Sequence, residues 1–169
     1  MGPAAMLAPP APGPHCCRVH HPGAPMAIAF THVQELPVPP ARVFALIDDL
    51  PQTSRWLPPC VLLEKVGPGP NAPGDRLRYV YKQGGTQAEM AGTIVARRQD
   101  AQLHARYEDR MFIVDVDLRV APSGTGAQVT HAISMEPRTW FGRLLAPLIR
   151  MGLRKQTTDA ARNLASLLT

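Results

Sequence analysis

The sequence is poor in the residues that could cross-link a fold. Its 169 residues include only three cysteines, Cys16, Cys17 and Cys60. Because this number is odd and two of the cysteines are adjacent, they cannot form a framework of disulfides. No apolar run approaches the roughly 18 residues that a membrane span needs, and residues 1–25 lack the apolar core of a secretory signal. We therefore expect a cytoplasmic protein.

Acidic residues are also scarce, at 13 Asp and Glu against 18 Lys and Arg, which gives a formal net charge of +5. The positive charges, 15 of them arginine, are scattered singly or in pairs along the chain. Without a run of like charges, this balance indicates a solvated Arg-rich surface, and no nucleic-acid partner is expected. No carboxylate pair, zinc-like spacing or phosphate-binding glycine loop is present, so the sequence predicts neither a cofactor nor a metal.

The first 25 residues differ from the rest of the chain. They hold seven of the 19 prolines and no Asp or Glu, and they show no helical or strand period. We expect a disordered leader at 1–25 and one ligand-binding domain at 26–169. A cluster at 15–21 contains histidines and cysteines, which are good metal ligands, but no second ligand pair accompanies it. A second possibility is that translation starts at Met26, in which case the leader is an artefact of the gene model.

From Met26 onward the pattern predicts an α+β domain. A strand over 28–36 precedes Pro40, which suits the first turn of a short helix over 40–47, and a second helical turn follows at 52–57. Half-buried alternation then predicts six further strands, at 60–66, 75–82, 88–98, 102–108, 110–120 and 128–136. Gly84-Gly85 is typical of a two-residue hairpin turn. Regularly spaced strands that each bury one face favour an antiparallel sheet.

The end of the chain changes to a helical period. We predict a helix over 140–168, kinked at Pro147. Its apolar stripe comprises Trp140, Leu144, Leu148, Met151, Ala161, Leu164 and Leu168. This long helix is the only element that can cover the apolar face of the sheet.

Several short sequence segments carry a family resemblance. They are the segment 35–49, Trp56-Leu57-Pro58, the segment 62–66 with Gly74-Asp75, and the turn at 124–130. In this order they resemble the START-like (SRPBCC) superfamily of helix-grip domains, and in particular its polyketide cyclase/dehydrase-like branch. The chain departs from that pattern where Val38 replaces a common alanine. The resemblance covers about 26–169 and implies a curved seven-stranded sheet around the C-terminal helix, with an apolar cavity between them, but it implies no reaction.

The apolar phase of each strand predicts which side chains line that cavity. From the sheet they are Leu77, Tyr79, Tyr81, Met90, Ile94, Leu103, Tyr107, Phe112, Val114, Val116, His131 and Ile133. The helix would add Trp140, Leu144, Leu148 and Met151. Such a lining suits a small hydrophobic or amphipathic ligand, such as a lipid, an isoprenoid or a polyketide-like molecule.

Two alternatives to simple ligand binding stay open. His131 could act as the general base of a cyclase or dehydratase, although a buried histidine is more often satisfied by a neighbouring hydroxyl. Alternatively, Arg143, Arg150 and Arg154 share one helix face and could dock the protein on a membrane or a macromolecule. The pattern favours a binding module over an enzyme, and it specifies no oligomeric state.

Overall fold

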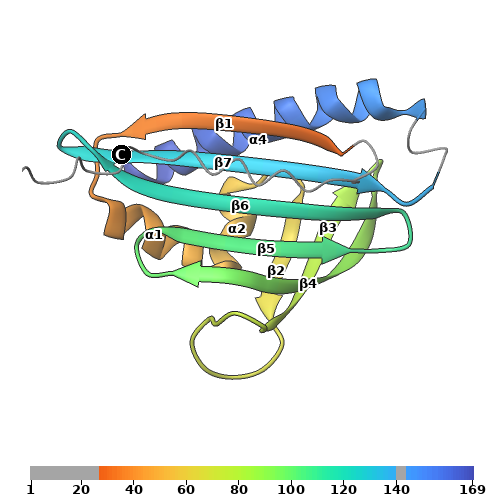
Figure 1. Ribbon diagram of the computed structural model, residues 1–169, viewed down its shortest axis with the longest axis horizontal. Coiled ribbons are helices and arrows are strands. Elements are labelled where there is room, and N and C mark those ends of the chain that lie inside the picture. The colour runs from red at the N-terminus through yellow and green to blue at the C-terminus, as the bar shows by residue number, and fades with distance from the viewer. Residues whose placement is uncertain (1–26, 140–143) are drawn as a thin grey trace, which may run out of the picture.

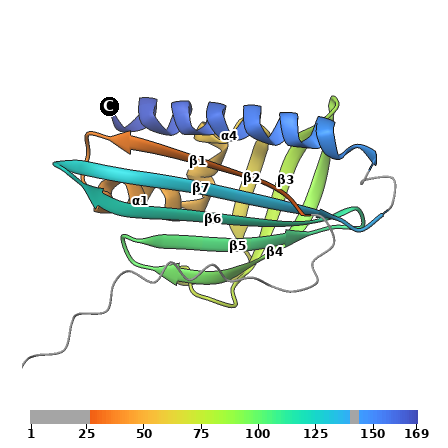
Figure 2. The ribbon, with the colours of Figure 1, turned by 45° about the horizontal axis from the view of Figure 1, so that its top comes forward.

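The computed structural model describes residues 27–139 and 144–169. A single antiparallel sheet curves around a long helix, α4 (Ala146–Leu168), which lies along its inner face (Figures 1 and 2). The seven strands are β1 (Ile28–Leu36), β2 (Cys60–Lys65), β3 (Arg76–Gln83), β4 (Thr86–Arg98), β5 (Gln102–Glu108), β6 (Phe112–Ser123) and β7 (Gly126–Pro137). Their spatial order is β1-β7-β6-β5-β4-β3-β2. The predicted α+β helix-grip architecture is therefore confirmed.

Two irregularities accompany the curvature of the sheet. The register shifts between Ile94 and Ala96 where β4 pairs with β5, and between Cys60 and Leu62 where β2 pairs with β3. Such bulges bend a strand and increase its twist. As a result, β2 and β3 run at a steep angle to β1, β7 and β6 (Figure 2). The hairpin between β3 and β4 turns at Gly84 and Gly85, both at positive φ, as the sequence predicts.

Two short helices close one end of the sheet: α1 (Pro40–Asp48) and α2 (Thr53–Trp56), joined by a 3-10 turn, η1 (Leu50–Gln52). The inner face of α1 buries Phe44 completely against the sheet. Asp48 accepts hydrogen bonds from Nε and a terminal nitrogen of Arg97 on β4, at 2.8 and 2.6 Å. The Arg97 guanidinium also lies over the Phe44 ring, 5.4 Å from its centre. This contact holds α1 in a defined position on the sheet.

The C-terminal helix begins later than the sequence predicts. Pro147 lies in the first turn of α4, so the predicted kink there is wrong: proline lacks a backbone N–H, and the first helical turn needs none. No helix among the described residues is long and apolar enough to cross a membrane. The leader at 1–25 with its His/Cys cluster, Trp140 and Arg143 lie outside the described residues.

The helix α4 carries two apolar faces, of which only one is buried. Its buried residues are Leu153, Thr157, Ala160, Ala161, Leu164 and Leu168. By contrast, Leu144, Leu148 and Met151 are 67%, 61% and 66% exposed, so their predicted place in the cavity wall is wrong. An α-helix turns by about 100° per residue, which puts Leu148 and Met151 on the side of α4 opposite the buried set. Because the second half of α4 is buried on one side, the first half of the helix must turn Leu148 and Met151 toward solvent.

The ring of Tyr107 packs directly over Gly92 of β4, where a side chain would collide with it. A Cβ at position 92 would lie 2.6 Å from one ring carbon of Tyr107, closer than real contacts allow. We expect Gly92→Ala to lower the free energy of unfolding by about 1–3 kcal/mol, because the ring must leave its packed position. Gly152→Ala, in open space on α4, is the matched control and should raise it by about 0.5–1 kcal/mol. Urea unfolding checks both, and equal effects of the two substitutions would contradict the prediction.

Candidate functional site

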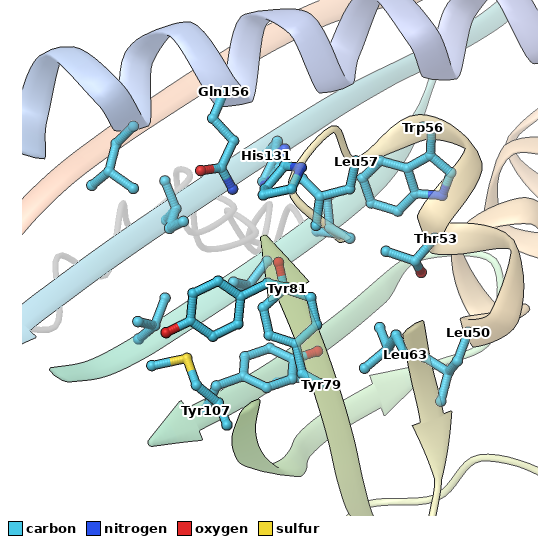
Figure 3. A pocket seen from close by; sticks show the side chains of 18 of the residues that line it. Leu50, Thr53, Trp56, Leu57, Leu63, Tyr79, Tyr81, Tyr107, His131 and Gln156 are labelled. Carbon is cyan, nitrogen blue, oxygen red and sulfur yellow. The ribbon is translucent and has the colours of Figure 1, made fainter. Parts of the chain in front are cut away.

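A pocket of about 240 Å³ lies between the inner face of the sheet and the helices (Figure 3). The strands contribute Leu63, Tyr79, Tyr81, Lys82, Met90, Leu103, Ala105, Tyr107, Phe112, Val114, Val116, Leu118, His131, Ile133 and Met135. The helices and their connections add Ile47, Leu50, Thr53, Trp56, Leu57, Pro59, Leu153 and Gln156. The wall is mostly apolar, with a few polar groups, which is the usual character of a small-molecule site.

Three tyrosines form a cluster on the sheet side of the pocket. Tyr79 lies between Tyr81 of its own strand and Tyr107 of β5, with ring centres 5.4 and 5.3 Å apart. Tyr81 donates a hydrogen bond to Asp109 Oδ2 at 3.4 Å, and this aspartate also caps the turn before β6. Tyr79 and Tyr107 have no hydrogen-bond partner within the described part of the chain, and their hydroxyls are not sealed off from open space. These two hydroxyls are available to a molecule in the pocket.

The tyrosines stay protonated throughout the ordinary pH range. Burial is the main cause that raises the pKa of Tyr79 and of Tyr107. Burial also raises the pKa of Tyr81, and the neighbouring Asp109 carboxylate adds to that shift. Each phenol can therefore donate a hydrogen bond to a carbonyl or ether oxygen.

His131 lies on the opposite side of the pocket, together with Gln156 of α4 (Figure 3). Its side chain is buried, and its ring meets the Trp56 indole edge-on, with centres 6.4 Å apart. Burial, with a smaller contribution from His32, lowers the pKa of His131 to about 4. At neutral pH the imidazole is thus uncharged, so it can both accept and donate a hydrogen bond.

Most of the predicted lining lies where the strand alternation puts it. The predicted residues that do line the pocket are Tyr79, Tyr81, Met90, Leu103, Tyr107, Phe112, Val114, Val116, His131 and Ile133. Leu77 and Ile94 point inward as predicted but are buried in the core and do not reach the pocket. The sequence alone does not show which inward residues are covered by their neighbours.

Sequence reasoning missed the contribution of the helices. Thr53 and Gln156 supply polar groups to the pocket and Trp56 supplies an aromatic ring, and no strand alternation could indicate any of the three. Gln156 had one usable signal: it lies three residues after Leu153 and four before Ala160, on the edge of the face that α4 buries. The position of Trp56 depends on how α2 packs against α4, which is a tertiary contact.

A model of the family described as polyketide cyclase / dehydrase and lipid transport matches residues 27–169. No curated protein matches the sequence. Among solved structures, TTHA0849 from Thermus thermophilus superposes with a TM-score of 0.69 at 20% identity, covering 82% of this chain and 94% of that one.

Two further solved structures carry informative names. A START superfamily protein from Mycobacterium smegmatis has a TM-score of 0.69 at 11% identity, and the match covers 83% of this chain and 96% of that chain. The di-domain ARO/CYC protein StfQ from the steffimycin biosynthetic pathway has a TM-score of 0.70 at 8% identity. That match covers 84% of this chain and 50% of StfQ. At these identities the three structures show a shared fold.

The lowered pKa of His131 predicts a stability that depends on pH. An ordinary histidine in the unfolded chain has a pKa of about 6.5 and binds a proton at pH values where the folded protein does not. The stability due to neutral His131 is therefore present above about pH 6.5 and is lost as the pH falls toward about 4. In His131→Gln, we expect the loss of unfolding free energy between about pH 7 and 4.5 to be about 2–3 kcal/mol smaller than in the wild type.

Urea unfolding at the two pH values measures this difference. His104→Gln is the control, because His104 lies on the outer face of the sheet beside Asp115. An identical pH dependence in His131→Gln and the wild type would show that His131 is not held neutral by the fold.

Proposed function

The chain belongs to the polyketide cyclase / dehydrase and lipid transport family, and we propose that it binds a small hydrophobic or amphipathic molecule in the pocket between the sheet and α4. One observation carries this proposal: the pocket wall is mostly apolar, and its polar side chains, Lys82 excepted, are neutral at pH 7. No carboxylate is among the residues that line it. A neutral wall avoids the cost of burying a charge beside an apolar ligand.

The arrangement of the polar groups supports a ligand with an apolar body and hydrogen-bonding groups at two places. The tyrosines lie on one side of the pocket, whereas His131 and Gln156 lie on the other (Figure 3). The apolar surface between them comes from residues such as Val116 and Ile133. Lipids, isoprenoids and polyketide-like molecules share this amphipathic character.

The alternative function is that of a cyclase or dehydratase acting on a polyketide-like substrate, with His131 as general base. Its supporting observation is that a neutral imidazole and protonated phenols border one pocket. However, a general base works best when its pKa is near the working pH. With a pKa of about 4, His131 is a weak base at neutral pH. Ligand binding is therefore the first proposal and catalysis the second.

Filling the pocket should prevent binding. Val116 lies on its wall, and Val116→Trp should weaken the binding of a dansyl-labelled fatty acid by at least about tenfold, because the indole occupies ligand volume. Val95→Trp is the matched control, since Val95 is exposed on β4 and should leave affinity unchanged. The fluorescence of the bound probe measures both. Equal affinity of the two folded variants, or a wild type that takes up no probe, would overturn the proposal.

We further propose that the exposed apolar face of α4 makes transient contact with anionic membranes. Leu148 and Met151 project from this face. Arg150 and Arg154 are exposed on an adjoining side of α4, with no ion-pair partner in the described residues. An apolar ridge with arginines on an adjoining side of the same helix suits the boundary between lipid headgroups and acyl chains. Because α4 also lines the pocket through Gln156, such contact would bring the pocket close to a source of lipid.

Substitutions on α4 test whether these exposed residues bind a membrane. The double substitution Leu148→Ser/Met151→Ser should lower binding to phosphatidylserine-containing vesicles by at least about tenfold, through the loss of buried apolar area. Val33→Ser/Val66→Ser, at exposed valines elsewhere, is the control. Arg150→Glu/Arg154→Glu should also weaken binding, and added salt should weaken wild-type binding. Vesicle sedimentation that is the same for all variants and at all salt concentrations would exclude the contact.

A further inference from the structure

A second, much smaller pocket of about 10 Å³ lies behind His131, between α4 and the edge of the sheet. Its polar lining consists of His32 and Gln34 of β1 together with His131. Leu118, Trp56, Val129 and three residues of α4 supply the apolar remainder. This volume is about the size that one water molecule requires. The pocket is thus small, polar on one side and bordered by the same histidine that borders the large pocket.

The register of the sheet brings these polar groups together. His32 is directly opposite His131 in the antiparallel pairing of β1 with β7. Residues paired in this way point to the same face, with Cβ atoms about 4.5–5.5 Å apart. Gln34, two residues further along β1, points to that face as well. On α4, Ala160 and Ala161 border the pocket with small side chains.

His131 has two ring nitrogens, and each can take one hydrogen-bond partner. Neither nitrogen has a hydrogen bond within the described part of the chain, and neither is sealed off from open space. The Trp56 indole cannot serve as a partner, because its nitrogen points away from His131 (Figure 3). A buried imidazole needs partners on both sides. Both pockets are open spaces that His131 borders.

We propose that the small pocket holds one water molecule, bound between a ring nitrogen of His131 and the side chains of His32 and Gln34, and that this water selects the tautomer of His131. If the water accepts a hydrogen bond from the N–H of one nitrogen, the other nitrogen faces the large pocket as an acceptor, and the reverse tautomer presents a donor. His32 and Gln34 are then positioning residues. They determine which hydrogen-bonding group of a ligand His131 recognises, a step that rests on the proposed function.

The groups that face His131 from the two pockets are consistent with a neutral imidazole. The titratable groups that face it are His32 from β1, and Tyr79, Tyr81, Tyr107 and Lys82 across the large pocket. The pocket-lining residues of α4 and β6 carry no charge. Two neutral tautomers therefore compete, and a hydrogen bond on one side separates them when the water's other partners, His32 and Gln34, fix its direction.

The tautomer can be read directly from the ¹⁵N chemical shifts of ¹⁵N-histidine-labelled protein. In the wild type we expect His131 to show one dominant tautomer. In Gln34→Leu and in His32→Leu, which remove polar partners and keep bulk, the shifts should move toward the average of both tautomers. Val33→Leu, on the outer face of the same strand, is the matched control and should leave the shifts unchanged. Circular dichroism and Tm identify folded variants, and Gln34→Met replaces any variant that does not fold.

A pair of probes tests the consequence for recognition. The hydroxyl of 1-naphthol can donate a hydrogen bond, whereas 1-methoxynaphthalene can only accept one. The ratio of their Kd values should change by about threefold or more in Gln34→Leu, the size of one net hydrogen bond, and should stay constant in Val33→Leu. Unchanged ¹⁵N shifts in both folded Leu variants would overturn the water site. If neither probe binds the wild type, the proposed function fails, while the ¹⁵N shifts still decide the water site.

Discussion

The rest of the molecule depends on the contact between α4 and the sheet. The helix makes this contact through a face that includes Thr157, Ala160 and Leu164. Alanine and threonine let the second half of the helix lie close to β1 and β7, where only the small pocket is left. Around Leu153 and Gln156 the sheet curves away, and the large pocket occupies the space. The same contact turns Leu148 and Met151 outward. One packing arrangement therefore produces the pocket, its back wall and the exposed apolar ridge.

The chemistry of the pocket follows from the burial of its side chains. Burial is the largest cause that raises the pKa of the tyrosines and lowers the pKa of His131, so the uncharged form of each group is favoured at neutral pH. A wall of neutral hydrogen-bonding groups can orient an amphipathic molecule without an ionic partner. The same burial makes His131 a poor proton acceptor. General-base catalysis asks for a pKa near the working pH, whereas the proposed binding asks for a neutral hydrogen-bonding group, and the surroundings of His131 keep it neutral.

Local rules were sufficient for most of the architecture. The alternation of Phe112, Val114 and Val116 with Asp115 and Asp117 predicts both the strand and its buried face, because a pleated strand allows only two orientations. Proline and glycine mark the helix start at Pro40 and the turn at Gly84-Gly85 for reasons of backbone geometry. A helix offers many orientations, and α4 carries apolar residues on two faces. The pattern could not decide which face would be buried, so the prediction for Leu148 and Met151 failed.

The sequence by itself determined the order of the elements, the inward phase of each strand and therefore the inward position of His131 and the tyrosines. These properties depend on neighbours two to four residues away, which the chain encodes locally. The tertiary structure alone decided that His32 meets His131, that Trp56 and Gln156 join the pocket and that Ile94 does not reach it. Each of these results depends on register or on helix packing between segments far apart in the chain. Such contacts arise only when the sheet closes around α4.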